Sequence, residues 1–199
     1  MTDYQLVTFN KDIEDQFFKF CKEASLQDDP AAINMWADDW KKQPHTLPYI
    51  LVNSNRYSSP NGEFFLVVRN SEIVGCSGIY FSEFNPSVAL AGCRTWITSE
   101  HRNKSLPRDV LLPAQKQWAH DRNVGAVGLT FNDYNKTLIN TWKRIRLGEN
   151  RSPRQAHHLF YSNFNEVDFP VTIQYTKQWV IYEKLDPNFN FDWISIQCK

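Results

Sequence analysis

A basic turn near the middle of the chain has the residue types that bind an anion. In the stretch EHRNKSLPRDV, Arg102, Lys104 and Arg108 bring positive charge and Ser105 brings a hydroxyl donor. The residues before it predict a strand and those after it predict a helix, so the turn would expose the backbone N–H groups of a helix start. We therefore expect a phosphate group here, while an ordinary solvated turn would carry the same charges.

The elements that must position this turn follow from hydrophobic periodicity. Strands are predicted at 4–9, 63–69, 72–81, 88–98 and 125–131, with a closing pair of strand-like runs at 170–185. Helices are predicted at 10–24, 28–42, 108–123 and 132–145. The two strands of 63–81 form a hairpin through a four-residue turn, and Pro113 should kink the helix that it interrupts. The segment 44–64 is rich in Pro, Ser and Asn and is predicted to be irregular.

The composition restricts the class of protein. A chain of 199 residues with 42% hydrophobic content can bury one sizeable core, which predicts a single domain over 1–199. Its 22 acidic and 22 basic residues balance, so global charge gives no reason to expect a nucleic-acid binder. The N-terminus lacks the pattern of a signal peptide and no apolar run would span a bilayer, which predicts a soluble cytoplasmic protein without membrane contact.

The cysteines do not form a recognisable metal or disulfide pattern. Cys21, Cys76, Cys93 and Cys198 are scattered along the chain without a C-x-x-C pair. We expect four reduced thiols and no metal site. Cys93 lies within an apolar strand and is expected to behave as a small buried hydrophobic residue.

The run WITSEHRNKSLPRDVLLPAQKQWAHDRNVGAVGLTFNDYNKTLINTWKRIRL resembles the central motif of the GNAT superfamily of acyl-CoA-dependent N-acyltransferases. In that family a strand ends at a corner, a glycine-containing turn binds the pyrophosphate of CoA, and a helix follows. Here SEHR matches the corner, RNKSLP the turn and NDYNKTLINTW the next helix, while the earlier run IVGCSGIY is similar to the family's third strand. The resemblance covers about residues 3–186 and implies an α+β fold with a mixed, mostly antiparallel central sheet flanked by helices.

The resemblance also implies a co-substrate, acetyl-CoA or another acyl-CoA, and a set of residues that bind it. These are Ile97, Ser99, Arg102, Asn103, Lys104, Ser105, Leu106, Pro107, Arg108 and Asn135. Asn135 is also a good N-cap for the helix that it precedes. The family has glycines where this chain has Ser105 and Pro107, and it often has a tyrosine acid where this chain has Trp142, whose spacing also suits a core position.

The implied reaction is the transfer of an acyl group to a primary amine, which requires a base to deprotonate the ammonium. Glu83, just past the third predicted strand, is the candidate base, although a glutamate in a turn is usually only solvated. The acceptor would be a small-molecule or peptide amine. Two alternatives remain: a non-catalytic binding protein of the same fold, and nucleic-acid contact through the basic stretch 143–158, which also suits a solvated loop.

Overall fold

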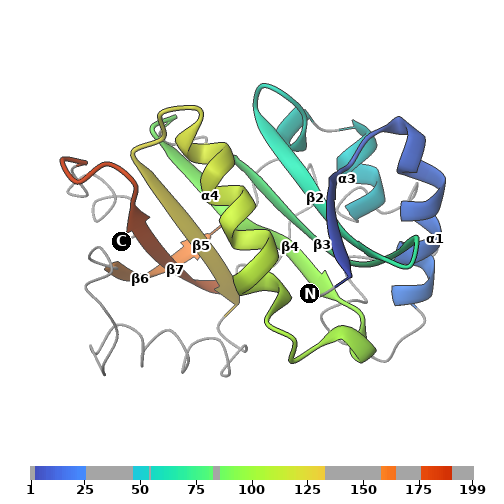
Figure 1. Cartoon of the computed structure of the whole chain (residues 1–199). Coiled ribbons are helices and arrows are strands. Elements are labelled where there is room, and N and C mark those ends of the chain that lie inside the picture. The colour runs from blue at the N-terminus through green and yellow to red at the C-terminus, as the bar shows by residue number, and fades with distance from the viewer. Residues whose placement is uncertain are drawn as a thin grey trace. The chain divides into compact units, whose positions relative to one another are not determined.

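The computed structural model describes residues 3–25, 47–53, 55–82, 86–132, 158–164 and 176–189, and for 130–132, 158–164 and 176–182 the backbone alone. The strands are β1 (Tyr4–Thr8), β2 (Gly62–Arg69), β3 (Glu72–Phe81), β4 (Val88–Ile97), β5 (Ala126–Asn132), β6 (His158–Phe164) and β7 (Thr176–Lys184). The α-helices are α1 (Glu14–Ser25), α3 (Leu47–Asn53) and α4 (Leu112–His120), as Figure 1 shows. Short helical turns are η1 (Lys11–Ile13), η3 (Asn55–Tyr57), η4 (Ser99–His101) and η5 (Pro107–Leu111), of which η5 is a π-helical turn.

The strands form a sheet in the order β1-β2-β3-β4-β5-β7-β6. The pairs β1–β2, β2–β3, β5–β7 and β6–β7 are antiparallel. The chain divides into two compact units, one of residues 1–81 with 91–118 (unit 1) and one of residues 82–90 with 119–199 (unit 2). The predicted α+β class with a mixed, mostly antiparallel sheet is confirmed.

The hairpin of β2 and β3 forms where the sequence predicts it. Arg69 pairs with Glu72, and the two residues between them, Asn70 and Ser71, have φ of 50° and 64°. Left-handed backbone at both central residues is the turn geometry that matches the twist of a two-residue hairpin. This turn fixes the register of β2 against β3.

One face of the unit 1 sheet is covered by α1. Phe17 of α1 meets Phe64 of β2 with ring centroids 5.9 Å apart, and Phe20 meets Trp96 of β4 at 5.3 Å. Phe17 is fully buried, in agreement with the apolar periodicity of the predicted helix at 10–24. Aromatic contacts therefore hold α1 against the strand that leads to the basic turn.

The other face of this sheet is covered by α4. The Gln115 side chain of α4 donates to the Ser77 hydroxyl, whereas a side chain at Gly78 would collide with Tyr57 and Phe64. Because successive residues of a strand point to opposite faces, Ser77 and Gly78 mark the two sides of β3. The strand β4 and its basic turn thus have helices on both sides.

The helix predicted at 108–123 begins with an irregular turn. The residues Pro107–Leu111 form the π-helical turn η5, and the Leu112 N–H donates to the Pro107 carbonyl. Pro113 follows as the second residue of α4, inside the continuous helical run 107–120, and has no N–H to donate to the turn before it. The structural irregularity that Pro113 predicts is present as this π turn immediately before it.

The prediction of an irregular segment at 44–64 is wrong for 47–53 and 55–57, whereas 58–61 form a turn, and 44–46 and 54 lie outside the described residues. The residues Leu47–Asn53 form α3, and Asn55–Tyr57 form η3. Leu47 and Ile50 are buried, and Pro48 stands in the first turn of α3, which needs no N–H donor there. Burial of the apolar pair outweighs the turn preference of the surrounding Pro, Ser and Asn residues.

The sequence prediction also missed β6. The run HLFYSNF pairs with β7 over its whole length, from His158 against Tyr182 to Phe164 against Thr176. The basic stretch 143–158 before it suits a solvated loop, whereas the aromatic residues of this run favour a strand. Of the closing pair predicted at 170–185, one strand is present as β7, and 170–175 lie outside the described residues, as do the helices predicted at 28–42 and 132–145.

Candidate functional site

The basic turn lies between β4 and α4, as predicted, and its backbone has a glycine-like conformation. Asn103 and Ser105 have φ of 61° and 57°, in the left-handed region that favours glycine. The N–H groups of Asn103, Lys104 and Ser105 have no hydrogen-bond partner within the described part of the chain. Successive free N–H groups next to left-handed residues form a concave site for an anion. The turn therefore has this backbone geometry without the glycines of the family motif.

The turn is fixed to the fold on its helix side. The Ser105 carbonyl accepts the N–H groups of Arg108 at 3.0 Å and Asp109 at 2.8 Å. The Leu106 side chain is buried, so Leu106 could contribute to a ligand only through its backbone. Pro107 opens η5, where a helix does not need its N–H.

The three cations of the turn differ in how far they are already engaged. Arg102 donates from Nε to the Ile97 carbonyl at 3.0 Å, and its guanidinium lies 5.7 Å from the Trp96 ring centroid. Arg108 makes a two-point ion pair with Asp109, at 2.6 and 2.9 Å. This pairing lowers the pKa of the Asp109 carboxyl and raises that of Arg108, so both groups stay charged and their charges partly offset each other.

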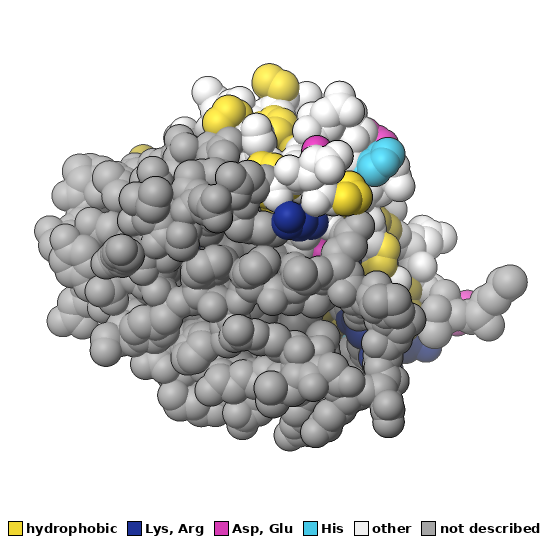
Figure 2. Space-filling view, turned by 90° about the vertical axis from the view of Figure 1, so that its left-hand side faces the viewer, with side chains coloured by type: hydrophobic (Ala, Val, Ile, Leu, Met, Phe, Trp, Pro, Cys, Tyr) yellow, Lys and Arg dark blue, Asp and Glu magenta, His cyan; other side chains and the backbone are white. Residues whose placement is uncertain are grey.

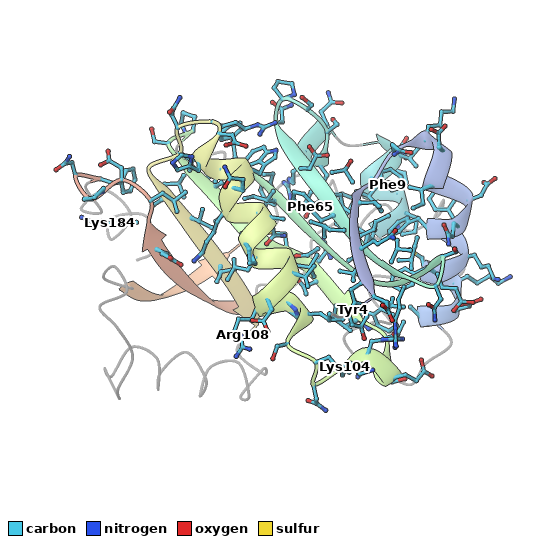
Figure 3. All side chains as sticks on the ribbon, in the orientation of Figure 1. Tyr4, Phe9, Phe65, Lys104, Arg108 and Lys184 are labelled. Atoms are coloured by element: carbon cyan, nitrogen blue, oxygen red, sulfur yellow. The ribbon has the colours of Figure 1, made fainter. Side chains whose placement is uncertain are left out.

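Lys104 is an exposed cation of the turn, as are Arg102 and Arg108. Its ammonium has no ion pair or hydrogen bond among the residues that the structure describes. Figure 3 shows Lys104 and Arg108 at the same end of unit 1 as Tyr4. Lys104 is therefore the cation of this turn whose charge is least committed to the protein itself.

A buried hydroxyl without a partner lies at the end of β4. The Thr98 side-chain oxygen is buried and has no hydrogen-bond partner among the described residues, while its N–H donates to the Val74 carbonyl at 2.9 Å. Buried hydroxyls are normally hydrogen-bonded, so this one is a candidate for a ligand contact. It lies between Ile97, which is buried, and Ser99, which is exposed, and both belong to the predicted cofactor-binding set.

The corner before the turn is tied to the first strand. The Tyr4 hydroxyl lies 2.8 Å from Nδ1 of His101, and the two rings meet edge to face. Partial burial lowers the pKa of His101 from its ordinary value of 6.5, and the nearby charges of Lys104 and Arg69 lower it further. A neutral His101 with its proton on Nε2 accepts the Tyr4 hydroxyl.

The middle of β4 departs from regular strand geometry. Gly92 and Arg94 have φ of 71° and 54°, so two left-handed residues flank Cys93. The Thr95 hydroxyl donates to the Gly92 carbonyl at 2.7 Å, and the Cys76 thiol contacts the Arg94 carbonyl at 3.6 Å. We call residues 92–95 the β4 bulge. Left-handed non-glycine residues are often found at functional sites, where the surrounding structure holds them.

Gln115 is the residue that sequence reasoning missed. Its side chain is 1% exposed and accepts the Gly92 N–H at 3.1 Å. Its neighbour Ala114 is only half-buried, so Gln115 rather than Ala114 lies on the buried face of α4. The signal was its spacing, since Gln115 follows Leu111 by four residues and precedes Trp118 by three.

Three of the remaining residues predicted for the site lie outside the part of the chain that the structure describes. Glu83, Asn135 and Trp142 are outside the described residues. Cys93 is buried, as predicted. No group of three potential metal ligands occurs within the described ranges, and no helix there is long and apolar enough to cross a membrane.

The described side chains on the face in Figure 2 do not form a patch of a single residue type, whether charged or hydrophobic. The described side chains on that face mix hydrophobic, basic, acidic and histidine types. Within the described residues, therefore, this face gives no basis for a charged or apolar docking surface.

Several solved structures of similar fold are acetyltransferases by description. An acetyltransferase of the GNAT family from Staphylococcus aureus Mu50 superposes with a TM-score of 0.56 at 15% identity, over 92% of this chain and 99% of its own. The PaiA N-acetyltransferase from Thermoplasma acidophilum, in complex with coenzyme A, has a TM-score of 0.58 at 10% identity, with the same coverage. The ribosomal-protein-S18-alanine N-acetyltransferase from Escherichia coli has a TM-score of 0.55 at 12% identity, over 94% and 99% of the two chains.

Sequence comparison alone does not find these similarities. No protein-family model matches the chain, and a search of curated proteins finds no significant match. The fold is assigned instead from the structure. The assignment rests on the superposition over nine-tenths of the chain, on the strand order and on the turn between β4 and α4. The protein is a divergent chain with the fold of the GNAT acetyltransferases.

Proposed function

We propose that the protein is an N-acyltransferase that moves an acetyl or other acyl group from acyl-CoA to a primary amine. The observation that carries this proposal is the backbone of the basic turn. Asn103 and Ser105 are left-handed, and free N–H groups accompany them, in a protein with the GNAT fold. Such a turn suits a pyrophosphate, because oriented N–H groups bind phosphate oxygens without a dedicated side chain.

The end of β4 could bind the pantetheine arm of acyl-CoA. With the pyrophosphate on residues 102–108, the pantetheine arm would run along residues 95–99. The partnerless Thr98 hydroxyl lies in that stretch and matches the amide groups of the arm. Lys104 would add charge attraction for the phosphates, and Arg102 would fix the end of β4 through Ile97. Asn135, in the helix that the sequence predicts at 132–145, is proposed to contact the arm.

The reaction would be a direct transfer. The amine nitrogen attacks the thioester carbonyl and the new C–N bond forms. The C–S bond then breaks, and the proton that the nitrogen loses is taken up by the departing thiolate, which leaves as CoA thiol. Glu83 is the proposed base that takes the ammonium proton. Backbone N–H donors of β4 would stabilise the negative oxygen of the tetrahedral intermediate. The acyl carbon would then lie beside the β4 bulge, beyond the pantetheine contacts at 95–99.

The acceptor is proposed to be a small-molecule or peptide amine. The neighbours include an enzyme described as acting on ribosomal protein S18 alanine and another described as a spermidine N-acetyltransferase. Both descriptions name primary amines, one on a protein and one on a small polyamine. A cytoplasmic location remains a prediction from the sequence.

The first test is thermal stabilisation by CoA. A ligand at about 100 times its Kd stabilises by about 2.7 kcal/mol, which raises the Tm of a chain of this size by about 5–10 °C. We expect acetyl-CoA at about 1 mM to raise the Tm, and Lys104→Ala to reduce this increase. Lys11→Ala, an exposed cation of η1, is the matched control and should not reduce it. The absence of any increase in the wild type would remove the co-substrate and the proposal with it.

The second test separates catalysis from binding. Release of free thiol from acetyl-CoA is measured with a panel of primary amines that includes spermidine, lysine peptides and peptides with an N-terminal alanine. Release that depends on one acceptor class supports the proposal and identifies that class. Stabilisation by CoA without thiol release from any acceptor would favour the non-catalytic binding protein instead.

A further inference from the structure

Gln115 is placed as a buried connection between three segments of unit 1. From α4 it donates to the Ser77 hydroxyl at 2.8 Å and to the Gly78 carbonyl at 3.0 Å, both in β3. It also accepts the N–H of Gly92 in β4 at 3.1 Å. Both N–H donors of its amide and its oxygen are therefore engaged, at a position that is 1% exposed.

These hydrogen bonds end on the β4 bulge. The Ser77 hydroxyl that Gln115 binds lies 2.6 Å from the Thr95 hydroxyl, and Thr95 in turn donates to the Gly92 carbonyl at 2.7 Å. Side chains thus bind both backbone polar groups of Gly92. A regular strand would instead give such groups to the neighbouring strand, so the network holds a backbone shape that the sheet alone does not provide.

The backbone shape in question is strained at one residue. Gly92 adopts its φ of 71° without penalty, but Arg94 has a side chain and holds a φ of 54° inside a strand. Such a conformation persists only where the surrounding structure determines it. The side-chain hydrogen bonds involve Gly92 and Thr95, the two ends of the bulge, and the Cys76 thiol contacts the Arg94 carbonyl between them.

We infer that Gln115 is a positioning residue for acyl transfer: with Ser77 and Thr95, it holds the β4 bulge in the conformation that aligns the strand's backbone with the thioester. This inference rests on the proposed function, because it takes the acyl carbon to lie beside residues 92–95. Gln115 has no contact with substrate in this role. It acts through Gly92, and small displacements of such supporting groups cost about 100-fold in rate.

The test uses the full chain and substitutions matched in size. Gln115→Met keeps the volume and removes the amide, and Thr95→Val removes the hydroxyl that Thr95→Ser retains. We expect Gln115→Met and Thr95→Val to lower kcat by about 10-fold or more, while the Kd of Gln115→Met for CoA stays within about twofold of the wild type. Thr95→Ser should restore most of the rate. In an NMR experiment, Gln115→Met should also speed hydrogen exchange at the Gly92 amide.

The outcomes distinguish this inference from the proposed function. If the wild type releases no thiol from acetyl-CoA with any amine, the proposed function fails and the positioning role fails with it. If the wild type is active and Gln115→Met keeps its kcat despite faster exchange at Gly92, only the positioning role is overturned. Equal loss of kcat, CoA affinity and Tm in Gln115→Met and in both Thr95 variants would show a role in general stability and would also overturn it.

Discussion

The Tyr4 hydroxyl lies 2.8 Å from Nδ1 of His101, although 97 positions separate the two residues along the chain. Tyr4 opens the first strand, and His101 ends the short helical turn that leads into the basic turn. The guanidinium of Arg69, at the end of β2, lies 5.3 Å from the Tyr4 ring centroid. The corner before the candidate site is therefore held by residues from two other strands.

Removing the Tyr4 hydroxyl should lower the stability of the protein by the contribution of its hydrogen bond to His101. A part-buried hydrogen bond contributes about 1 kcal/mol, so Tyr4→Phe should lower the Tm by about 2–4 °C. Tyr49→Phe is the matched control, since the Tyr49 hydroxyl has no hydrogen bond within the described residues. Thermal melts followed by circular dichroism measure both. Equal effects of the two substitutions would show that the Tyr4–His101 bond contributes nothing.

His101 should make the stability of the protein depend on pH. Its pKa in the folded state is lowered from 6.5 by burial and by Lys104 and Arg69, against the opposing charge of Glu100. Below pH 6.5 the unfolded chain therefore binds a proton that the folded protein resists, and stability falls as the pH falls through that range. Above pH 6.5 both states are neutral and this contribution is constant.

The comparison with His101→Gln isolates this effect. Other groups titrate in both proteins, so the difference in unfolding free energy between them should change between pH 7 and pH 5, with the wild type losing more. Urea unfolding at each pH gives that difference. A pH-independent difference would show that the pKa of His101 is not lowered by folding.

Substitutions at Ser105 should distinguish the effect of its backbone conformation from the effect of its hydroxyl group. A left-handed conformation destabilises a residue with a side chain by about 1–2 kcal/mol, and glycine avoids this cost. Glycine also loses more backbone entropy on folding, which lowers stability by about 0.5–1 kcal/mol. Ser105→Gly should therefore leave stability unchanged or raise it by up to about 1 kcal/mol. Ser105→Val should lower it, because a branched side chain fits this conformation poorly.

The same variants report on ligand binding. Ser105→Gly keeps the turn and should keep the stabilisation by acetyl-CoA, and Ser105→Ala shows what the hydroxyl adds. The melting temperature with and without about 1 mM acetyl-CoA measures each. A Ser105→Gly variant that unfolds more easily than Ser105→Ala would contradict the left-handed backbone at this position.

The buried cysteines should resist thiol reagents in the folded protein. Cys21, Cys76 and Cys93 are buried free thiols, and burial raises the pKa of Cys21 and Cys76 well above the ordinary value. Reagents attack the thiolate, which is therefore scarce and inaccessible. In a Cys198→Ser variant, a chromogenic disulfide should react slowly with the native protein and with three thiols after denaturation. Rapid reaction of the native variant would contradict this burial. Slow reaction would mean that the protein's own thiols add little background to the assay that measures release of CoA thiol.

The sequence by itself determined most strands and the order of elements around the site. Alternating and apolar runs indicated β1 to β5, and a turn with Asn70 and Ser71 indicated the hairpin, because these signals depend on residues close together in the chain. The basic turn was located in the same way. The helix α3 and the strand β6 were missed, since turn-forming residues and a charge run next to them masked short apolar patterns.

The conformation and burial of the site residues depend on tertiary packing. The left-handed backbone at Ser105, the strained Arg94 and the partnerless Thr98 hydroxyl depend on the packing around β4, which no local pattern records. Gln115 and Gly92 are 23 residues apart and belong to different elements. Their hydrogen bond exists because α4 packs across the sheet face that carries Ser77, and such contacts between distant residues are specified by the whole fold.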